Sequence, residues 1–262
     1  MEKLTLRAAP ASEVLAAGWA LTRVAQLVGA APVLDKALVA LGVSQANRCE
    51  YDVRAWLGVL RLLGRPELAD AIERGEPPAD ARLAALLHWA RATAGPVPPT
   101  TAPGEPLAEY VGTALCSHFI NRMVLAMLPP RPAPIQDRMP GASLPLLAGL
   151  PTGVAPGWGD GTPAGKAYAA LAVVAAQGAR LLTPEARDVV RDVIAGHRGR
   201  LTDRLRLALP ARDRRYARIA ILAGLAPATI TVEAPVHLVA YGAMTAVRHI
   251  EADVTVAAYP AG

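Results

Sequence analysis

One short stretch of the chain gathers a thiol, two carboxylates, a phenol and an indole. It reads Asn47-Arg48-Cys49-Glu50-Tyr51-Asp52-Val53-Arg54-Ala55-Trp56. A thiolate can act as a nucleophile or a redox group, and a carboxyl group can act as a general acid or base. These residue types predict either thiol chemistry at Cys49 or proton transfer at Asp52. Glu50, Tyr51 and Trp56 are candidate substrate-binding residues beside them.

A second stretch places a histidine, an asparagine and an arginine on one face of a predicted helix. His118 lies three residues before Asn121 and four before Arg122, and both spacings bring helical side chains together. We expect His118 to serve as a second acid/base group near Asp52, and Asn121 and Arg122 to bind substrate. The structural alternative is that Arg122 forms an ion pair with Asp52 or Glu109.

Together the two stretches resemble the AhpD-like, or carboxymuconolactone decarboxylase, family of all-helical proteins. The family motif has a Glu, a Cys-x-x-Cys pair and a His four residues after the second Cys, and it typically contains Asn-x-Cys-x-Tyr-Cys, which is similar to residues 47–52 here. Residues 118–124 resemble the Asn-Arg helix that follows the motif. Residues 218–227 resemble the C-terminal half of longer, two-part members.

The resemblance also shows which parts of the family motif this chain has replaced. Cys49 stands at the first Cys position, whereas Ala37, Asp52 and Trp56 stand where the family has Glu, the second Cys and His. In the peroxidase cycle that the family implies, Glu and His lower a thiol pKa and move protons, and the second Cys resolves the oxidised first one. The resemblance therefore predicts that dithiol cycling is lost here, and it supplies a precedent for metal-free decarboxylation.

Cys49 itself has two opposed interpretations. Most free cysteines are buried and behave as small apolar side chains, and Cys49 at a helix start fits that pattern. The neighbouring Asp52 and Glu50 would raise the pKa of its thiol, while the helix dipole would favour their own charged forms. Cys116 could replace the missing resolving thiol only if packing brings the two sulfur atoms together.

Other common site motifs are incomplete in this sequence. Residues 159–166 superficially suggest a phosphate-binding loop, but Asp160 occupies the first Gly position and Ala167 follows Lys166 in place of Ser or Thr. The five histidines show no paired spacing for metal ligands. We therefore expect no metal and no cofactor.

The composition favours an all-α fold. The chain of 262 residues is 53% hydrophobic and 4% aromatic, with many alanines and leucines, which favour helices. The net charge of +5 comes without aromatic residues interleaved among the basic ones, so we expect no nucleic-acid partner. The longest apolar run, residues 167–176, is too short to span a bilayer, and the N-terminus lacks a signal-peptide pattern. A cytoplasmic location is expected, with no membrane partner.

Gly and Pro residues divide the chain into an AhpD-like helical half (1–128), a connector (129–162) and a second helical half (163–262) packed on the first. Helices are expected at 12–28, 32–48, 50–64, after Pro66, and at 79–94, 105–128, 163–182, 184–196, 212–225 and 235–251. Residues 229–233 have strand propensity, but one strand makes no sheet. A faint similarity between 37–49 and 217–229 fits either a duplication or shared helical periodicity.

Three functions follow from these observations. The first is cofactor-independent acid/base chemistry, such as decarboxylation, isomerisation or cyclisation, on a small organic substrate at Asp52 and His118. The second is a one-Cys thiol peroxidase that uses Cys49. The third is a non-catalytic helical protein that forms homo-oligomers, as members of this fold often do.

Overall fold

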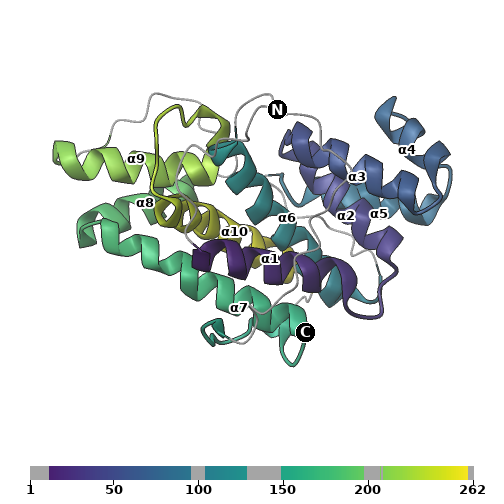
Figure 1. Cartoon of the computed structure of the whole chain (residues 1–262), viewed down its shortest axis with the longest axis horizontal. Helices are drawn as coiled ribbons and strands as arrows, with labels where there is room; N and C mark the ends of the chain where they lie inside the picture. The colour runs from purple at the N-terminus through teal and green to yellow at the C-terminus, as the bar shows by residue number, and fades with distance from the viewer. Residues whose placement is uncertain (1–11, 96–103, 129–148, 198–206, 208, 259–262) are drawn as a thin grey trace.

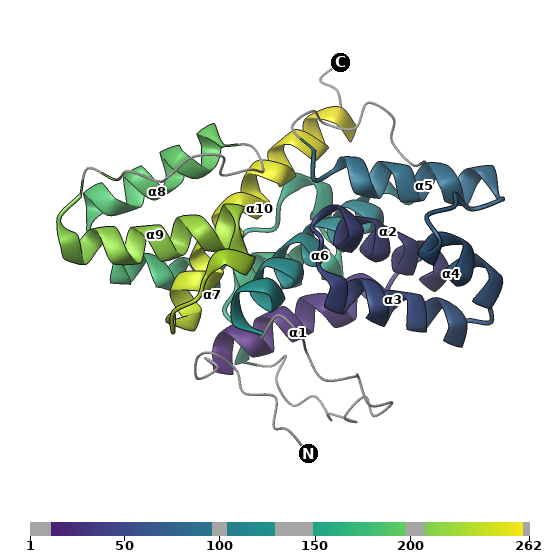
Figure 2. The same ribbon diagram turned by 90° about the horizontal axis from the view of Figure 1, so that it is seen from above.

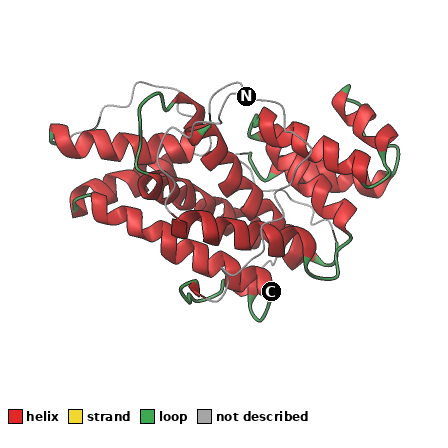
Figure 3. Ribbon diagram, in the orientation of Figure 1, coloured by secondary structure: helices red, strands yellow, loops and turns green. Residues whose placement is uncertain are grey.

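The computed structural model describes residues 12–95, 104–128, 149–197, 207 and 209–258. In this part of the chain every regular element is a helix and no strand occurs (Figure 3), which confirms the all-α prediction. The six helices of the first half are α1 (Ser12–Leu27), α2 (Val33–Ala46), α3 (Glu50–Leu62), α4 (Pro66–Glu73), α5 (Ala81–Ala92) and α6 (Leu107–Met127). The second half contains α7 (Pro163–Ala176), α8 (Pro184–Gly196), α9 (Ala211–Leu225) and α10 (Val236–Ala258), with short 3-10 turns η2 (Gly157–Gly159), η3 (Gln177–Leu181) and η4 (Pro227–Thr229).

Local chemistry explains most helix boundaries. The side chains of Asp80, Thr162 and Thr183 accept hydrogen bonds from backbone N–H groups at the starts of α5, α7 and α8. Proline occupies the first turn of α4, α7 and α8, where its missing N–H costs nothing. The phosphate-loop-like run is therefore the N-terminal cap of α7. The strand-like segment 229–233 forms no strand.

Helix α6 connects the two halves. It packs against α2 and α1 on one side and against α10 on the other, and α10 in turn packs on α7, α8 and α9. Figure 1 shows α6 between the group of α2 to α5 and the group of α8 to α10, and Figure 2 shows the same arrangement from above. One large apolar cluster continues through α1, α6, α7, α9 and α10, so both halves share a core. The domain boundaries and the internal duplication stay predictions.

A smaller apolar cluster joins α2 to α3, α4 and α5. Residues 35–44 of α2 are buried without interruption, so this helix is covered on all sides. Gly42 allows the close approach of α5, because a Cβ atom there would lie 2.8 Å from the Cβ atom of Ala90. Helix α2 is thus rigidly held, and the turn that follows it is fixed in place.

Within the described residues, no helix is both long enough and apolar enough to span a bilayer. The same part of the chain holds no group of three or more metal-ligating side chains.

Candidate functional site

The turn between α2 and α3 presents the motif residues. Helix α2 ends in a Schellman motif, in which the N–H of Cys49 donates to the carbonyl of Ser44 (2.9 Å) and the N–H of Arg48 donates to that of Gln45 (3.1 Å). Arg48 adopts the left-handed conformation that this motif requires (φ 55°). Cys49 then occupies the N-cap position of α3. The reversal places Asn47, Cys49 and Asp52 against α6.

Seven polar side chains meet there, and we call them the Asp52 network. Asp52 Oδ2 accepts a hydrogen bond from Asn121 Nδ2 (2.5 Å) and one from Cys49 Sγ (3.5 Å). Asn121 also donates to Ser44 Oγ (3.1 Å), and its own Oδ1 accepts from Asn47 Nδ2 (2.9 Å). The network comprises Ser44, Asn47, Cys49, Asp52, Thr93, His118 and Asn121.

The network fixes the tautomer of His118. Asn47 Nδ2 can only donate, so His118 Nδ1, 3.1 Å away, accepts. His118 Nε2 therefore carries the proton and donates to Thr93 Oγ1 (2.9 Å), whose hydroxyl donates to the carbonyl of Ala90 (2.7 Å). Burial, and then the charge of Arg122, lower the pKa of His118 well below its ordinary value. His118 is thus a neutral imidazole at physiological pH.

The carboxyl group of Asp52 lies in surroundings that disfavour its charge. Burial raises the pKa of Asp52 against the opposing hydrogen bonds from Asn121 and Cys49. We expected the α3 dipole to favour the charged form of this group, but burial has the larger effect on its pKa. Burial, followed by the charge of Asp52, raises the pKa of the Cys49 thiol and confirms the expected direction. The same two causes raise the pKa of Tyr51.

The structure brings only some of the predicted site residues together. Cys49, His118 and Asn121 are almost completely buried, and Asp52 is 8% exposed. Glu50 instead lies on the solvent-exposed face of α3, where it pairs with Arg54 (3.1 Å). Tyr51 is half-buried beside the network. Trp56 is half-buried and packs against the small apolar cluster of α2 to α5.

Arg122 lies at the edge of the Asp52 network. Its Nη1 donates to the carbonyl of His118 (2.9 Å) and lies 3.4 Å from His118 Nδ1, as the i, i+4 spacing predicts. Its Nε donates to the carbonyl of Gly224 on α9 (2.9 Å). The expected ion pair with Asp52 or Glu109 is wrong. Asp52 bonds to neutral groups, and Glu109 is taken by Lys36.

The two cysteines are free thiols with separate partners. Cys116 contacts Thr22 Oγ1 on α1 (3.6 Å), whereas Cys49 contacts Asp52. Burial raises the pKa of Cys116 to about 12. Neither thiol is in the charged form that attacks disulfides or peroxides.

Sequence reasoning did not include three members of the network among the site residues. Asn47 belongs to the motif itself, so its position beside Cys49 was an available signal. Ser44 lies one helical turn earlier on α2 and carried a weaker signal. Thr93 stands at the end of α5 and is joined to His118 only by the fold, so no local pattern pointed to it.

The motif turn packed on the helix that carries Asn121 and Arg122, within an all-helical fold, fits the AhpD-related class of protein that the sequence resembles. Comparison with known proteins agrees: the chain belongs to the AhpD-like family. It is 32% identical to the protein named alkyl hydroperoxide reductase Rv2159c of Mycobacterium tuberculosis, over 92% of this chain and 83% of that relative. No protein-family model matches the chain. No solved structure matches it either.

Proposed function

We propose that this member of the AhpD-like family carries out cofactor-independent acid/base chemistry on a small organic substrate, with Asp52 as the proton-transferring group. The observation that supports this most is the state of the Asp52 carboxyl. It is buried, its pKa is raised, and within the described residues no cation pairs with it. A carboxyl group with a raised pKa is suited to donate a proton near neutral pH.

The bonds of Asp52 assign a role to each of its oxygen atoms. Oδ2 is occupied by Asn121 and Cys49, whereas Oδ1 has no hydrogen bond to any described residue. Oδ1 is therefore the atom from which a substrate would take, or to which it would return, a proton. His118 holds Asn47 in place and supports the network as a neutral group. Decarboxylation, isomerisation and cyclisation all need such a proton transfer at carbon or oxygen.

The one-Cys peroxidase is a weaker candidate. A peroxidatic cysteine attacks as the thiolate, and burial, the largest cause of the raised pKa of the Cys49 thiol, opposes that form. The non-catalytic alternative is favoured by one observation, the complete burial of His118 and Asn121. Homo-oligomer formation and a cytoplasmic location stay predictions.

Proton exchange at carbon tests the proposal without knowledge of the natural substrate. Short ketones, 2-oxo acids and γ-lactones would be incubated with the full chain in D2O, and deuterium at the carbon next to the carbonyl would be followed by NMR. We expect exchange with at least one probe, and a loss of about 10²- to 10⁴-fold in Asp52→Asn. Cys49→Ala, which changes the other partner of the same oxygen, should retain most of the exchange.

Two results would contradict this proposal. Exchange that is equal in the unmutated chain and Asp52→Asn would remove Asp52 from the chemistry. Hydroperoxide reduction by the unmutated chain that disappears in Cys49→Ser would establish the peroxidase instead. If no probe exchanges and no hydroperoxide is reduced, the non-catalytic alternative replaces both.

A further inference from the structure

Helix α3 has an apolar face that points away from the helices on which α3 packs. Its inner side chains Asp52, Leu57 and Leu60 are buried, and the helix packs on α2 and α4. Figures 1 and 2 show α3 and α4 at the end of the molecule away from α8 and α9. On the opposite side of α3, residues that are four, three and four apart share one face. They are Tyr51, Ala55, Gly58 and Leu62, and we call them the outer face of α3.

The outer face is open as well as apolar. Leu62 is 89% exposed, and a Cβ atom built on Gly58 would have no neighbouring atom within 4 Å. Tyr51 and Ala55 are partly exposed. A single exposed leucine is common on protein surfaces, but this face continues for about three helical turns without a charged residue. A continuous apolar strip of this kind marks an interaction surface.

The side-chain sizes on the outer face are arranged symmetrically. The large Tyr51 and Leu62 lie at its two ends, and the small Ala55 and Gly58 lie at its centre. When two copies of α3 cross antiparallel at this centre, Tyr51 of each copy meets Leu62 of the partner subunit. The small residues meet in the middle and let the two backbones approach closely. The outer face is therefore self-complementary, as the interface of a two-fold symmetric dimer must be.

The charges beside the outer face differ in sign between its two ends. The exposed charged residues at the start of α3 have one positive charge in surplus, and those at its end and on α4 have one negative charge in surplus. They are Arg48, Glu50 and Arg54 at the start, and Arg61, Arg65, Glu67, Asp70 and Glu73 at the end. Antiparallel pairing brings the positive end of one copy to the negative end of the other, and it also aligns the two helix dipoles favourably. An anionic membrane surface would instead favour an excess of basic residues around the whole face.

We propose that the outer face of α3 binds a second copy of this chain, in a two-fold symmetric pair of antiparallel α3 helices. This inference goes beyond the proposed acid/base function and does not depend on the reactivity of Asp52. Tyr51 precedes Asp52 on α3 and is half-buried beside the Asp52 network. Leu62 of the partner subunit would therefore cover the side of the network on which Tyr51 lies, so that each copy contributes a residue to the surroundings of the other copy's site.

Sedimentation equilibrium on the full chain tests the proposal. The unmutated chain should form dimers at micromolar concentration. Gly58→Arg places a charged side chain at the centre of the pair, where the single copy has open space, and it should weaken association at least about hundredfold. Gly196→Arg makes the same change at a glycine of α8 that also has open space, and it should leave association unchanged. A monomeric unmutated chain would overturn the proposal, and so would a Gly58→Arg chain that associates as tightly as the unmutated one.

Two further measurements test the arrangement and the choice of partner. In the antiparallel pair Ala55 faces Gly58 of the partner subunit, so an Ala55→Cys chain mixed with a Gly58→Cys chain should form an intermolecular disulfide faster than either chain alone. Faster linkage within each single variant would indicate parallel helices and overturn the arrangement. Binding of a monomeric chain to anionic lipid vesicles, lost in Leu62→Glu, would assign the outer face to a membrane instead. Asp52→Asn should associate like the unmutated chain even if it loses proton exchange, so this proposal and the acid/base proposal can fail separately.

Discussion

The interface between α2 and α6 has two polar ends that are built in opposite ways. At the start of both helices lies a charged group that we call the Lys36 cluster, and near the end of α2 lies the Asp52 network. In the Lys36 cluster each carboxylate has a cation. In the Asp52 network the only carboxyl group bonds to an amide and a thiol. The Lys36 cluster consists of Asp35, Lys36, Arg82, Glu109 and Tyr110.

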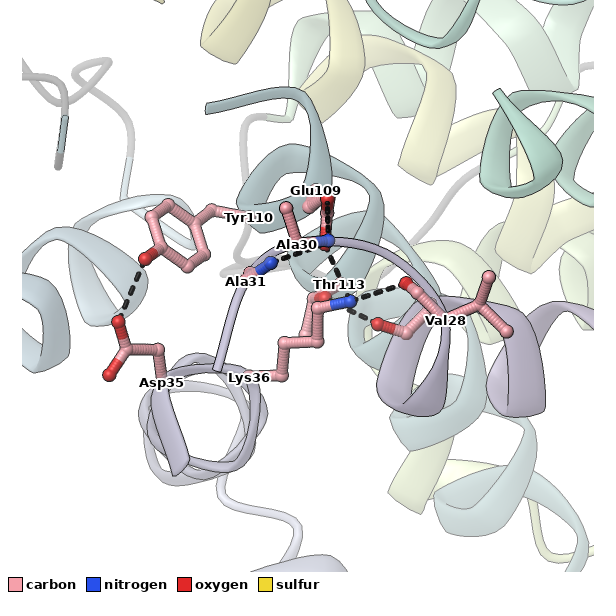
Figure 4. Close-up of polar contacts among 9 residues, drawn as sticks. Val28, Ala30, Ala31, Asp35, Lys36, Glu109, Tyr110 and Thr113 are labelled. Carbon is pink, nitrogen blue, oxygen red and sulfur yellow. Dashed lines mark hydrogen bonds and ion pairs between the residues drawn. The ribbon is translucent and has the colours of Figure 1, made fainter. Parts of the chain in front are cut away.

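The contacts of the Lys36 cluster stabilise the packing of neighbouring helices. Lys36 Nζ, almost completely buried, contacts Glu109 Oε2 (2.7 Å) and donates to the carbonyl of Val28 at the end of α1 (2.6 Å) (Figure 4). The Glu109 carboxylate also accepts from the N–H groups of Ala30 and Ala31 (2.7 and 3.0 Å). These contacts join the α1–α2 turn to α6.

A second carboxylate of the cluster connects three helices. Asp35 accepts two hydrogen bonds from Arg82 on α5 (2.6 and 3.0 Å) and one from the hydroxyl of Tyr110 on α6 (2.8 Å). Every charge in this cluster is therefore balanced, and nothing in it is left to exchange a proton with a substrate. The carboxylates of the Lys36 cluster therefore hold the fold together, whereas the Asp52 carboxyl group, which pairs with no cation among the described residues, suits the proton transfer that we propose for it.

The largest expected effect comes from breaking the Lys36 pair. Glu109→Gln leaves a buried ammonium without its counter-charge, so the free energy of unfolding in urea should fall by about 3 kcal/mol. Glu76→Gln breaks an exposed ion pair with Arg74 and should leave that free energy unchanged within error. If the two variants were equally stable, the Lys36–Glu109 ion pair would not stabilise the fold as its buried geometry indicates.

The Lys36–Glu109 ion pair also predicts how the stability of the chain depends on low pH. Burial acts to raise the pKa of Glu109, but the bonds from Lys36 and from the N–H groups of Ala30 and Ala31 outweigh it and lower the pKa below 4.5. A lowered folded-state pKa means that the stabilisation is fully present above the unfolded value of 4.5 and is lost as the pH falls through the folded value. The unmutated chain should therefore lose stability below about pH 4.5 more steeply than Glu109→Gln.

A smaller change in the free energy of unfolding should follow when one carboxyl group is neutralised at a time, and it should differ between the Lys36 cluster and the Asp52 network. Asp35→Asn removes the counter-charge of Arg82 and should lower the free energy of unfolding by about 1–3 kcal/mol. Asp52→Asn removes a carboxyl group whose burial is unfavourable when it is charged, and its amide oxygen can still accept from Asn121. It should leave stability unchanged or higher at pH 7.

The pH dependence of the Asp52 variant sharpens this contrast. Because the pKa of Asp52 is raised in the folded chain, its carboxyl begins to destabilise the fold as the pH rises above the unfolded value of 3.8. The advantage of Asp52→Asn should therefore grow with rising pH until the folded pKa is passed. Urea unfolding at a series of pH values measures it. A loss of stability in Asp52→Asn at pH 7 would show that Asp52 is held as a charged, structural group.

The sequence predicted the helices well because their signals are local. The Pro184 start of α8, the Gly64 stop after α3 and the periodic leucines of α2 each act within a few residues. It also identified Cys49, Asp52, His118 and Asn121 as neighbours, through the family resemblance. Contacts made only by the fold were missed, among them Thr93 on His118 and the burial of Lys36. Lysine in an apolar helix suggests a solvent-facing side chain, and only the approach of Glu109 from α6 explains its place inside.

The partner of Arg122 shows the same limit. Helical spacing correctly placed Arg122 beside His118, since that depends on α6 alone. Whether Arg122 bonds to Asp52, to Glu109 or to backbone carbonyls depends on how α9 approaches α6. Gly224 lies 102 residues further along the chain than Arg122. A charged side chain such as Arg122 suggests an oppositely charged partner. Here the acceptors are main-chain carbonyl oxygens, and every residue has one, so the sequence does not indicate which of them accepts.

The smallest expected effect concerns the thiol in the Asp52 network. In a Cys116→Ser background, so that only Cys49 reports, reaction with an aromatic disulfide reagent should be slow in the folded chain and rapid in urea. Burial is the larger cause of the raised thiol pKa and the charge of Asp52 is the second. Adding Asp52→Asn removes only the second cause, so the folded-state rate should rise by less than about tenfold, the equivalent of one pKa unit. A much larger rise would mean that the charge of Asp52, and not burial, is the main cause that suppresses the thiolate, and Cys49 would then become the reactive group of this site.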